Sequence, residues 1–172
     1  MKATLEDIAE IVVRSIRSGN KVLIFGVGGN ASTASHFAAE LAGKYEEYED
    51  PLPVICLNDN TSIITAITND FGWDQVFYRQ IKGLGKKGDV VVGLSISGKG
   101  KYLVEAFRAA CEKECIGILL NGGPPEEISE TWFDYIVSVG SLDTPEVQET
   151  QLMWIHQLSG MIKKDLADAF VN

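Results

Sequence analysis

Five short runs of apolar and β-branched residues recur along the chain, each bounded by glycine, proline or polar residues. They cover residues 22–25, 54–57, 90–94, 116–120 and 135–139. The runs are continuous rather than alternating, which is typical of strands buried on both faces of a parallel sheet. The pattern therefore predicts five buried strands.

Segments with the helical spacing of apolar residues separate these runs. They lie at about 31–43, at 61–68 continuing through 74–82, and at 100–113. A further stripe, which includes Leu5, Ile8 and Val12, predicts a first helix that ends near Gly19, and a last helix runs from Pro145 to about residue 170. Strands alternating with helices predict an α/β fold with crossover helices.

Length and composition indicate one globular domain spanning residues 1–172. The chain has 172 residues, 45% hydrophobic and 23% charged, and no apolar run approaches the roughly 18 residues of a membrane span. Its first residues carry acidic groups and fit no targeting peptide, so we expect a cytosolic protein without a membrane partner. Three cysteines without a CxxC motif argue against a disulfide framework.

The net charge is −9, from 15 basic and 24 acidic residues, so the overall field repels polyanions and no nucleic-acid partner is expected. A small anionic ligand remains compatible with this charge. Backbone N–H groups at a helix start bind an anion by direct contact, which outweighs distant surface charge.

Two glycine-containing loops follow predicted strands and lead into predicted helices. The first covers residues 26–32 and the second residues 95–100, with the sequence Ser-Ile-Ser-Gly-Lys-Gly. In parallel sheets ligands bind beyond the carboxyl ends of strands, at helix N-termini. The first loop also fits a dinucleotide fingerprint, with Asp59 as the ribose-binding acid, or a tight turn without a ligand. The hydroxyls of the second loop favour a monophosphate, although a turn without a ligand stays open there too.

The chain contains only two histidines, and both lie on predicted helices. His36 precedes Glu40 by four residues, which places both side chains on one helix face about 6 Å apart along the axis. His156 lies on the last helix, eight residues after Gln148, and both can face the same side. A packing role is the ordinary alternative for a single histidine on a partly apolar helix. The presence of two histidines, one of them beside a carboxylate in an apolar stretch, favours a chemical role over packing.

These motifs resemble the sugar isomerase (SIS) domain family and, within it, the phosphoheptose isomerases. The resemblance covers nearly the full chain and rests on five ordered blocks: residues 26–29, 36–41, 69–72, 88–98, and 144–149 with His156 beyond. It implies a flavodoxin-like three-layer sandwich with a five-stranded parallel sheet between helices. It also implies a homotetramer whose active sites lie at subunit interfaces.

The activity that the resemblance implies is an aldose-ketose isomerisation of a phosphorylated sugar through an enediol. The substrate implied is sedoheptulose 7-phosphate, and the product is D-glycero-D-manno-heptose 7-phosphate. Glu40 would move the proton between carbons, and His156 would donate and accept protons at the oxygens, a division that suits a carboxylate and an imidazole.

The resemblance also implies a metal site and a substrate-binding set. Many members hold zinc among residues that match His36, Glu40, Gln148 and His156, and nitrogen and carboxylate ligands suit that metal. The residues expected to bind substrate are Gly28, Gly29, Asn30, Asn69, Asp70, Ser95, Ser97, Gly98, Lys99 and Gln148.

The first loop and the helix after the second strand depart from the family pattern. Members usually carry Asn at the position of Val27 and Ser at that of Asn30. The acid that they place before the Asn69 block falls on Asn60, although Asp59 is adjacent. These changes concern the identity of the sugar more than the reaction.

The second loop of members usually is Ser-Thr-Ser-Gly-Asn-Ser, so this chain lacks two hydroxyls, at Ile96 and Gly100. Lys99 offers a point charge to the phosphate in their place. A non-catalytic phosphosugar-binding protein on the same scaffold is the alternative function. The regulator subgroup that shares the fold lacks the residues that correspond to Glu40 and His156, and this chain retains both.

Overall fold

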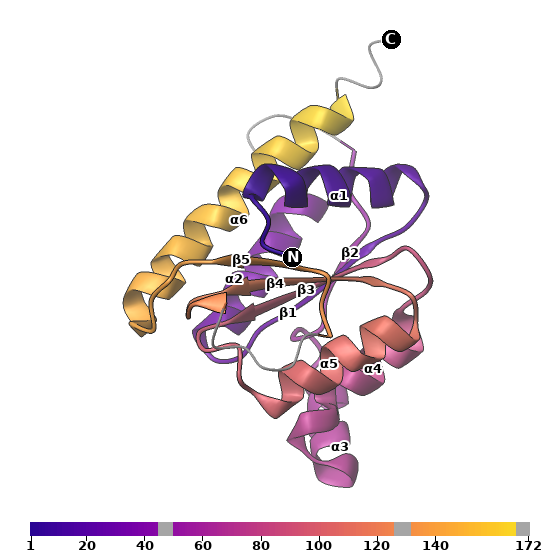
Figure 1. Cartoon of the computed structure of the whole chain (residues 1–172). Coiled ribbons are helices and arrows are strands. Elements are labelled where there is room, and N and C mark those ends of the chain that lie inside the picture. The colour runs from indigo at the N-terminus through magenta and orange to yellow at the C-terminus, as the bar shows by residue number, and fades with distance from the viewer. Residues whose placement is uncertain (45–49, 126–131, 168–172) are drawn as a thin grey trace.

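A five-stranded parallel sheet forms the centre of the molecule, with helices on both faces (Figure 1). The computed structural model describes residues 1–44, 50–125 and 132–167. The strands are β1 (Val22–Phe25), β2 (Val54–Cys56), β3 (Val90–Ser95), β4 (Ile116–Asn121) and β5 (Tyr135–Ser138), in the spatial order β2-β1-β3-β4-β5. All neighbouring pairs are parallel. The predicted α/β sandwich with five parallel strands is therefore confirmed.

The helices divide into two layers (Figure 1). One face of the sheet is covered by α1 (Leu5–Arg17), α2 (Gly29–Ala42) and α6 (Thr144–Ala167). The other face is covered by α4 (Val76–Leu84) and α5 (Lys101–Glu112), with the 3₁₀ turn η1 (Trp73–Gln75) against α5. Helix α3 (Thr61–Phe71) lies outside α4 on that side and has no buried residue. No helix in the described ranges combines the length and the hydropathy that a membrane span requires.

The pleat of β1 shows why the strands are apolar throughout. Val22 and Ile24 point into the core beneath α2 and α6, while Leu23 and Phe25 point into the core beneath α4 and α5. Side chains alternate between the faces of a strand, and here both faces are covered by helices. Each fully buried side chain of this kind contributes roughly 1.5–3 kcal/mol.

Local signals set the helix boundaries. Thr4 and Asp7 form a capping box that starts α1. The apolar pattern predicted at 61–82 is interrupted at Gly72, whose φ of 88° ends α3 before η1 and α4 begin. Helix α6 begins at Thr144 with Pro145 in its first turn, as the pattern predicts. The predicted end of this helix, near residue 170, lies outside the described residues.

Candidate active site

Helices α2 and α6 lie against each other and run in the same direction, because each follows the carboxyl end of a parallel strand. Three contacts mark their register. Gly29 at the start of α2 lies against the Gln148 amide, His36 meets His156, and the carbonyl of Gly43, at the end of α2, accepts from Lys163 Nζ at 3.0 Å. Steps of seven residues on α2 match steps of seven or eight on α6. Two turns of helix therefore separate one contact from the next.

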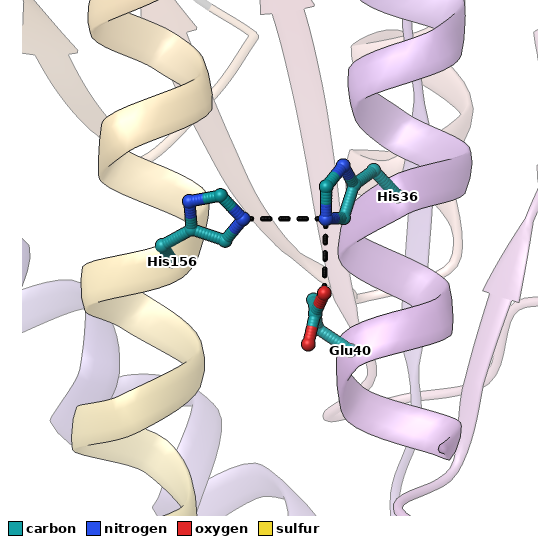
Figure 2. A group of neighbouring side chains, drawn as sticks. All are labelled: His36, Glu40 and His156. Atoms are coloured by element: carbon teal, nitrogen blue, oxygen red, sulfur yellow. Dashed lines mark hydrogen bonds and ion pairs between the residues drawn. The ribbon is translucent and has the colours of Figure 1, made fainter. Parts of the chain in front are cut away.

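The middle contact brings together His36, Glu40 and His156 (Figure 2). His36 Nε2 lies 2.9 Å from Glu40 Oε1 and 3.2 Å from His156 Nε2. All three ligand-type atoms lie within 4.8 Å of one another, and all three side chains are half-buried. The imidazole rings meet edge to face, with centroids 4.9 Å apart. The structure thus unites the histidines and the carboxylate that the sequence singles out.

One proton cannot satisfy both contacts of His36 Nε2. If this nitrogen carries a proton, it donates to Glu40 and has no lone pair left to accept from His156. If it carries none, it accepts from His156, and its contact with Glu40 then requires a protonated carboxyl group. A cation placed among the three atoms would accept a lone pair from each. Ligands of a tetrahedral zinc ion lie about 3.3 Å apart, close to the two separations observed. The geometry and the donor types fit a zinc ion.

Gln148 lies two turns away from this cluster along α6. A Cβ atom on Gly29 would lie 2.4 Å from Gln148 Nε2, so the amide packs directly on the glycine at the start of α2. Gly29 precedes His36 by seven residues, about 10 Å of helix rise. Gln148 therefore faces the first glycine loop, and its side chain has to turn toward His156 to join the cluster.

The first glycine loop is shaped by close backbone approach. Gly28 has a φ of 64°, and a Cβ on Gly26 would lie 2.4 Å from the carbonyl oxygen of Asn30. Asn58, which sequence reasoning missed, holds this loop: its Oδ1 accepts from the Gly26 N–H at 3.0 Å and its Nδ2 donates to the Gly26 carbonyl at 2.9 Å. The available signal was an amide two residues after β2, the strand beside β1.

The second loop, at the end of β3, is stabilised by its own hydroxyls. Ser95 Oγ accepts from the N–H of Gly98 at 2.9 Å, and Ser97 Oγ accepts from the N–H of Lys99 at 3.3 Å. Gly98 has a φ of 71°, which an L side chain rarely adopts. Ser95 itself is buried and Lys99 is exposed. Helix α5 starts immediately after the loop without a side-chain cap, so its N-terminus faces this loop.

Gln151 on α6, also missed, anchors the second loop from the other side. Its Nε2 donates to the carbonyls of Ser95 at 3.0 Å and Leu120 at 2.9 Å, at the ends of β3 and β4. The residue is fully buried. One helix therefore carries His156, Gln148 and the amide that holds Ser95.

Asn30, Asn69 and Asp70, three further predicted substrate-binding residues, also lie away from the cluster. Asn30 is 2% exposed, and its Oδ1 has no partner among the described residues. Asn69 and Asp70 are exposed near the end of α3, with Asn69 Nδ2 donating to Asp70 Oδ1 at 2.8 Å. Helix α3 lies beyond the sheet face opposite α2 and α6 (Figure 1), so one chain does not bring these two residues to His36.

The two residues before α3, Asp59 and Asn60, both make hydrogen bonds within the chain. Asn60 caps α3 by accepting from the N–H of Ile63 at 3.0 Å. Asp59 accepts a hydrogen bond from the Ser35 hydroxyl on α2. In this arrangement Asp59 ties the loop after β2 to α2.

Comparison with known proteins agrees with this fold. The model of the SIS domain matches residues 1–122. A phosphoheptose isomerase from Aliarcobacter butzleri is 39% identical over 167 residues, which cover 97% of this chain and 88% of the relative.

Two solved structures are similar over most of the chain. The phosphoheptose isomerase GmhA from Neisseria gonorrhoeae is 34% identical with a TM-score of 0.82, covering 91% of this chain and 83% of the other. A phosphoheptose isomerase from Francisella tularensis is 28% identical with a TM-score of 0.87, covering 93% and 85%.

A five-stranded parallel sheet with two glycine-containing loops at its carboxyl edge and helices on both faces agrees with the fold of these relatives. The chain belongs to the SIS domain family and, within it, to the group of phosphoheptose isomerases. The resemblance stated from the sequence is confirmed.

Proposed function

We propose that this protein is a phosphosugar isomerase that interconverts sedoheptulose 7-phosphate and D-glycero-D-manno-heptose 7-phosphate. The observation that carries the proposal is the meeting of His36, Glu40 and His156 between α2 and α6, in a chain whose relatives are named phosphoheptose isomerases. The reaction requires a base at carbon and an acid-base group at oxygen, and the cluster offers both.

Glu40 is the base in this proposal. It removes the pro-chiral proton from C1 of the ketose, which gives a 1,2-enediol, and returns a proton to C2 to form the aldose. His156 exchanges protons with the oxygens on C1 and C2, so that charge does not accumulate on the enediol. One carboxylate serves both carbons because they are adjacent.

His36, Glu40 and His156, with Gln148 as the fourth residue, would hold a zinc ion. When bound, zinc would act as a Lewis acid toward the substrate oxygens. The convergence of three lone pairs on one point supports this assignment. His36 then has a role distinct from proton transfer, since it orients Glu40 and supplies a metal ligand.

The second loop would hold the phosphate. Ser97, the N–H groups around Gly98, and the charge of Lys99 surround the N-terminus of α5, where an anion is favoured. Ser95 supports this cradle from beneath, because it is buried and its hydroxyl oxygen accepts from Gly98. Gly28, Gly29 and Asn30 would shape the sugar side of the site.

A homotetramer with interfacial active sites would explain the position of α3. This helix exposes Ile63 and Phe71, and Trp73 follows it, while α6 exposes Met153. Exposed apolar side chains on these helices favour contact with another copy. Such contact would also carry Asn69 and Asp70 to the site of a neighbouring chain. A cytosolic location accords with a phosphorylated substrate and is part of the proposal.

A direct assay tests this function. The protein, with and without added zinc, is incubated with sedoheptulose 7-phosphate, and the product is followed by NMR. We expect an aldose heptose 7-phosphate to accumulate to equilibrium. Tight binding of the ketose phosphate without turnover, under either metal condition, would instead favour the non-catalytic sensor.

A further inference from the structure

Tyr102 lies over the second loop and accounts for the glycine at position 100. A Cβ atom built on Gly100 would lie 2.3 Å from Cε1 of the Tyr102 ring. The backbone of Gly100 is extended, with a φ of −73°, which any residue can adopt. Gly100 is therefore required by the neighbouring ring and not by its own backbone conformation.

The Tyr102 ring cannot easily move aside to admit a side chain there. Its centroid lies 6.0 Å from that of Phe77 on α4 and 6.3 Å from that of Trp73 in η1. The turn η1 is in addition tied to α5 by an ion pair of 3.0 Å between Asp74 and Lys101. Aromatic neighbours on two elements fix the orientation of the ring, and with it the place of the hydroxyl.

The Tyr102 hydroxyl faces the Ser95 side chain at the other end of the same loop. Ser95 Oγ accepts from the N–H of Gly98 at 2.9 Å. Burial raises the pKa of Tyr102 above its usual value, and the contact with Ser95 lowers that pKa by a smaller amount, so the phenol stays neutral through the physiological range. Tyr102 therefore lies beside Ser95, which in turn accepts from the N–H of Gly98 at the turn.

We propose that Tyr102 is a positioning residue for phosphate binding: its hydroxyl fixes Ser95 and so the turn at Gly98, while its ring replaces a side chain at position 100. The inference rests on the proposed function, in which this loop binds the phosphate group. The loop lacks hydroxyls at positions 96 and 100, and Tyr102 brings one to the same turn from the first turn of α5.

The first test removes only the hydroxyl. Tyr102→Phe keeps the ring, and Tyr78→Phe is the matched control, since Tyr78 on α4 donates to Glu112 away from the loop. For Tyr102→Phe we expect the KM for sedoheptulose 7-phosphate and the inhibition constant of inorganic phosphate to rise together, about five- to tenfold, as loss of one hydrogen bond implies. The kcat and the unfolding temperature should stay close to those of the wild type, and Tyr78→Phe should change neither constant.

The second test measures coupling between the two positions. Gly100→Ala in the wild-type background should raise the inhibition constant of inorganic phosphate at least tenfold, because the new methyl group meets the ring. The same substitution in a Tyr102→Ala background should change that constant less than twofold.

The outcomes separate the two proposals. The role of Tyr102 alone is overturned by the following set of results. The wild-type protein binds inorganic phosphate, Tyr102→Phe binds it with unchanged affinity, and Gly100→Ala has the same effect in both backgrounds. Wild-type protein that neither binds inorganic phosphate nor isomerises the sugar overturns the proposed function, and this inference with it. A rise in KM with unchanged kcat, and coupling between the two positions, support the role.

Discussion

The Nε2 atoms of His36 and His156 lie 3.2 Å apart, although 120 positions separate the residues in the chain. The contact follows from topology. Parallel strands send α2 and α6 away from the same edge of the sheet, and Gly29 lets the start of α6 approach the start of α2 closely enough to touch. The same register then places His36 opposite His156 and Gly43 opposite Lys163.

Zinc binding should depend on both histidines. Titration of metal-free protein, followed by calorimetry and by the unfolding temperature, should show about one zinc ion per chain and a higher unfolding temperature with zinc. His36→Ala and His156→Ala should each weaken binding more than tenfold and remove the thermal shift. Gln157→Ala, next to His156 but exposed, is the control. Zinc affinity that is equal in all variants would contradict the metal site.

The same zinc titration tests whether Gln148 is the fourth ligand of the metal. Its amide rests on Gly29, so ligation requires it to turn toward His156. If Gln148→Ala weakens zinc binding as much as His36→Ala does, the side chain turns and completes the site. An unchanged zinc affinity would restrict the role of Gln148 to substrate binding.

The close approach of α2 and α6 should depend on the absence of a Cβ atom at Gly29. We expect Gly29→Ala to displace the Gln148 amide and to lower kcat/KM about tenfold or more, because small displacements at a reacting site have large effects. Gly83→Ala is the control, since nothing lies within 4 Å of a Cβ there and alanine favours a helix. That variant should keep full activity and gain up to about 1 kcal/mol of stability. Equal activity in both variants would contradict the importance of the helix contact.

The sequence predicted the sheet well because buried parallel strands leave continuous apolar runs. It also predicted that His36 and Glu40 share a face, since this depends only on helix geometry. It could not show that α3 is separated from α4 by the turn at Gly72, because the apolar periodicity continues across that residue. The glycine was the available signal.

The supporting residues were harder to predict than the chemical ones. Gln151 and Asn58 act through backbone carbonyls and amides on distant strands, and no local pattern reveals such partners. The role of Tyr102 depends on a ring that folds back over Gly100, which a sequence does not display. The single domain over residues 1–172, the cytosolic location and the residue roles stay predictions.

Stability at alkaline pH should depend on Cys115. Burial raises the pKa of this thiol from 9.0 to about 11. Below pH 9 the thiol is neutral in both states and contributes no pH dependence. Between pH 9 and 11 the unfolded chain loses the proton while the folded chain keeps it, so stability falls as pH rises.

Denaturant unfolding of Cys115→Ala at several pH values measures this effect. The variant should lose less stability than the wild type between pH 9 and 11, whatever its stability at neutral pH. Cys111→Ser, at an exposed thiol, should follow the wild type. Parallel curves for all three proteins would exclude Cys115 as the source.

The assembly should depend on α3. Light scattering of the wild type should give about 75 kDa, four times the chain mass of 18.8 kDa. Ile63→Asp places a charge on an exposed apolar face of α3 and should lower the mass and the activity together, because sites at interfaces need both chains. Trp132→Ser, at another exposed apolar residue, should change neither. A monomer with full activity would contradict interfacial sites.

Proton transfer by Glu40 is the central claim, and hydrogen exchange tests it most directly. Wild-type protein and Glu40→Gln are incubated with sedoheptulose 7-phosphate in deuterated water, and deuterium at C2 of the aldose and at C1 of the ketose is measured by NMR. The account predicts deuterium at both carbons with the wild type and a loss of at least a hundredfold in exchange rate with Glu40→Gln, while the unfolding temperature of the metal-free protein stays unchanged. Exchange at the wild-type rate in Glu40→Gln would contradict it.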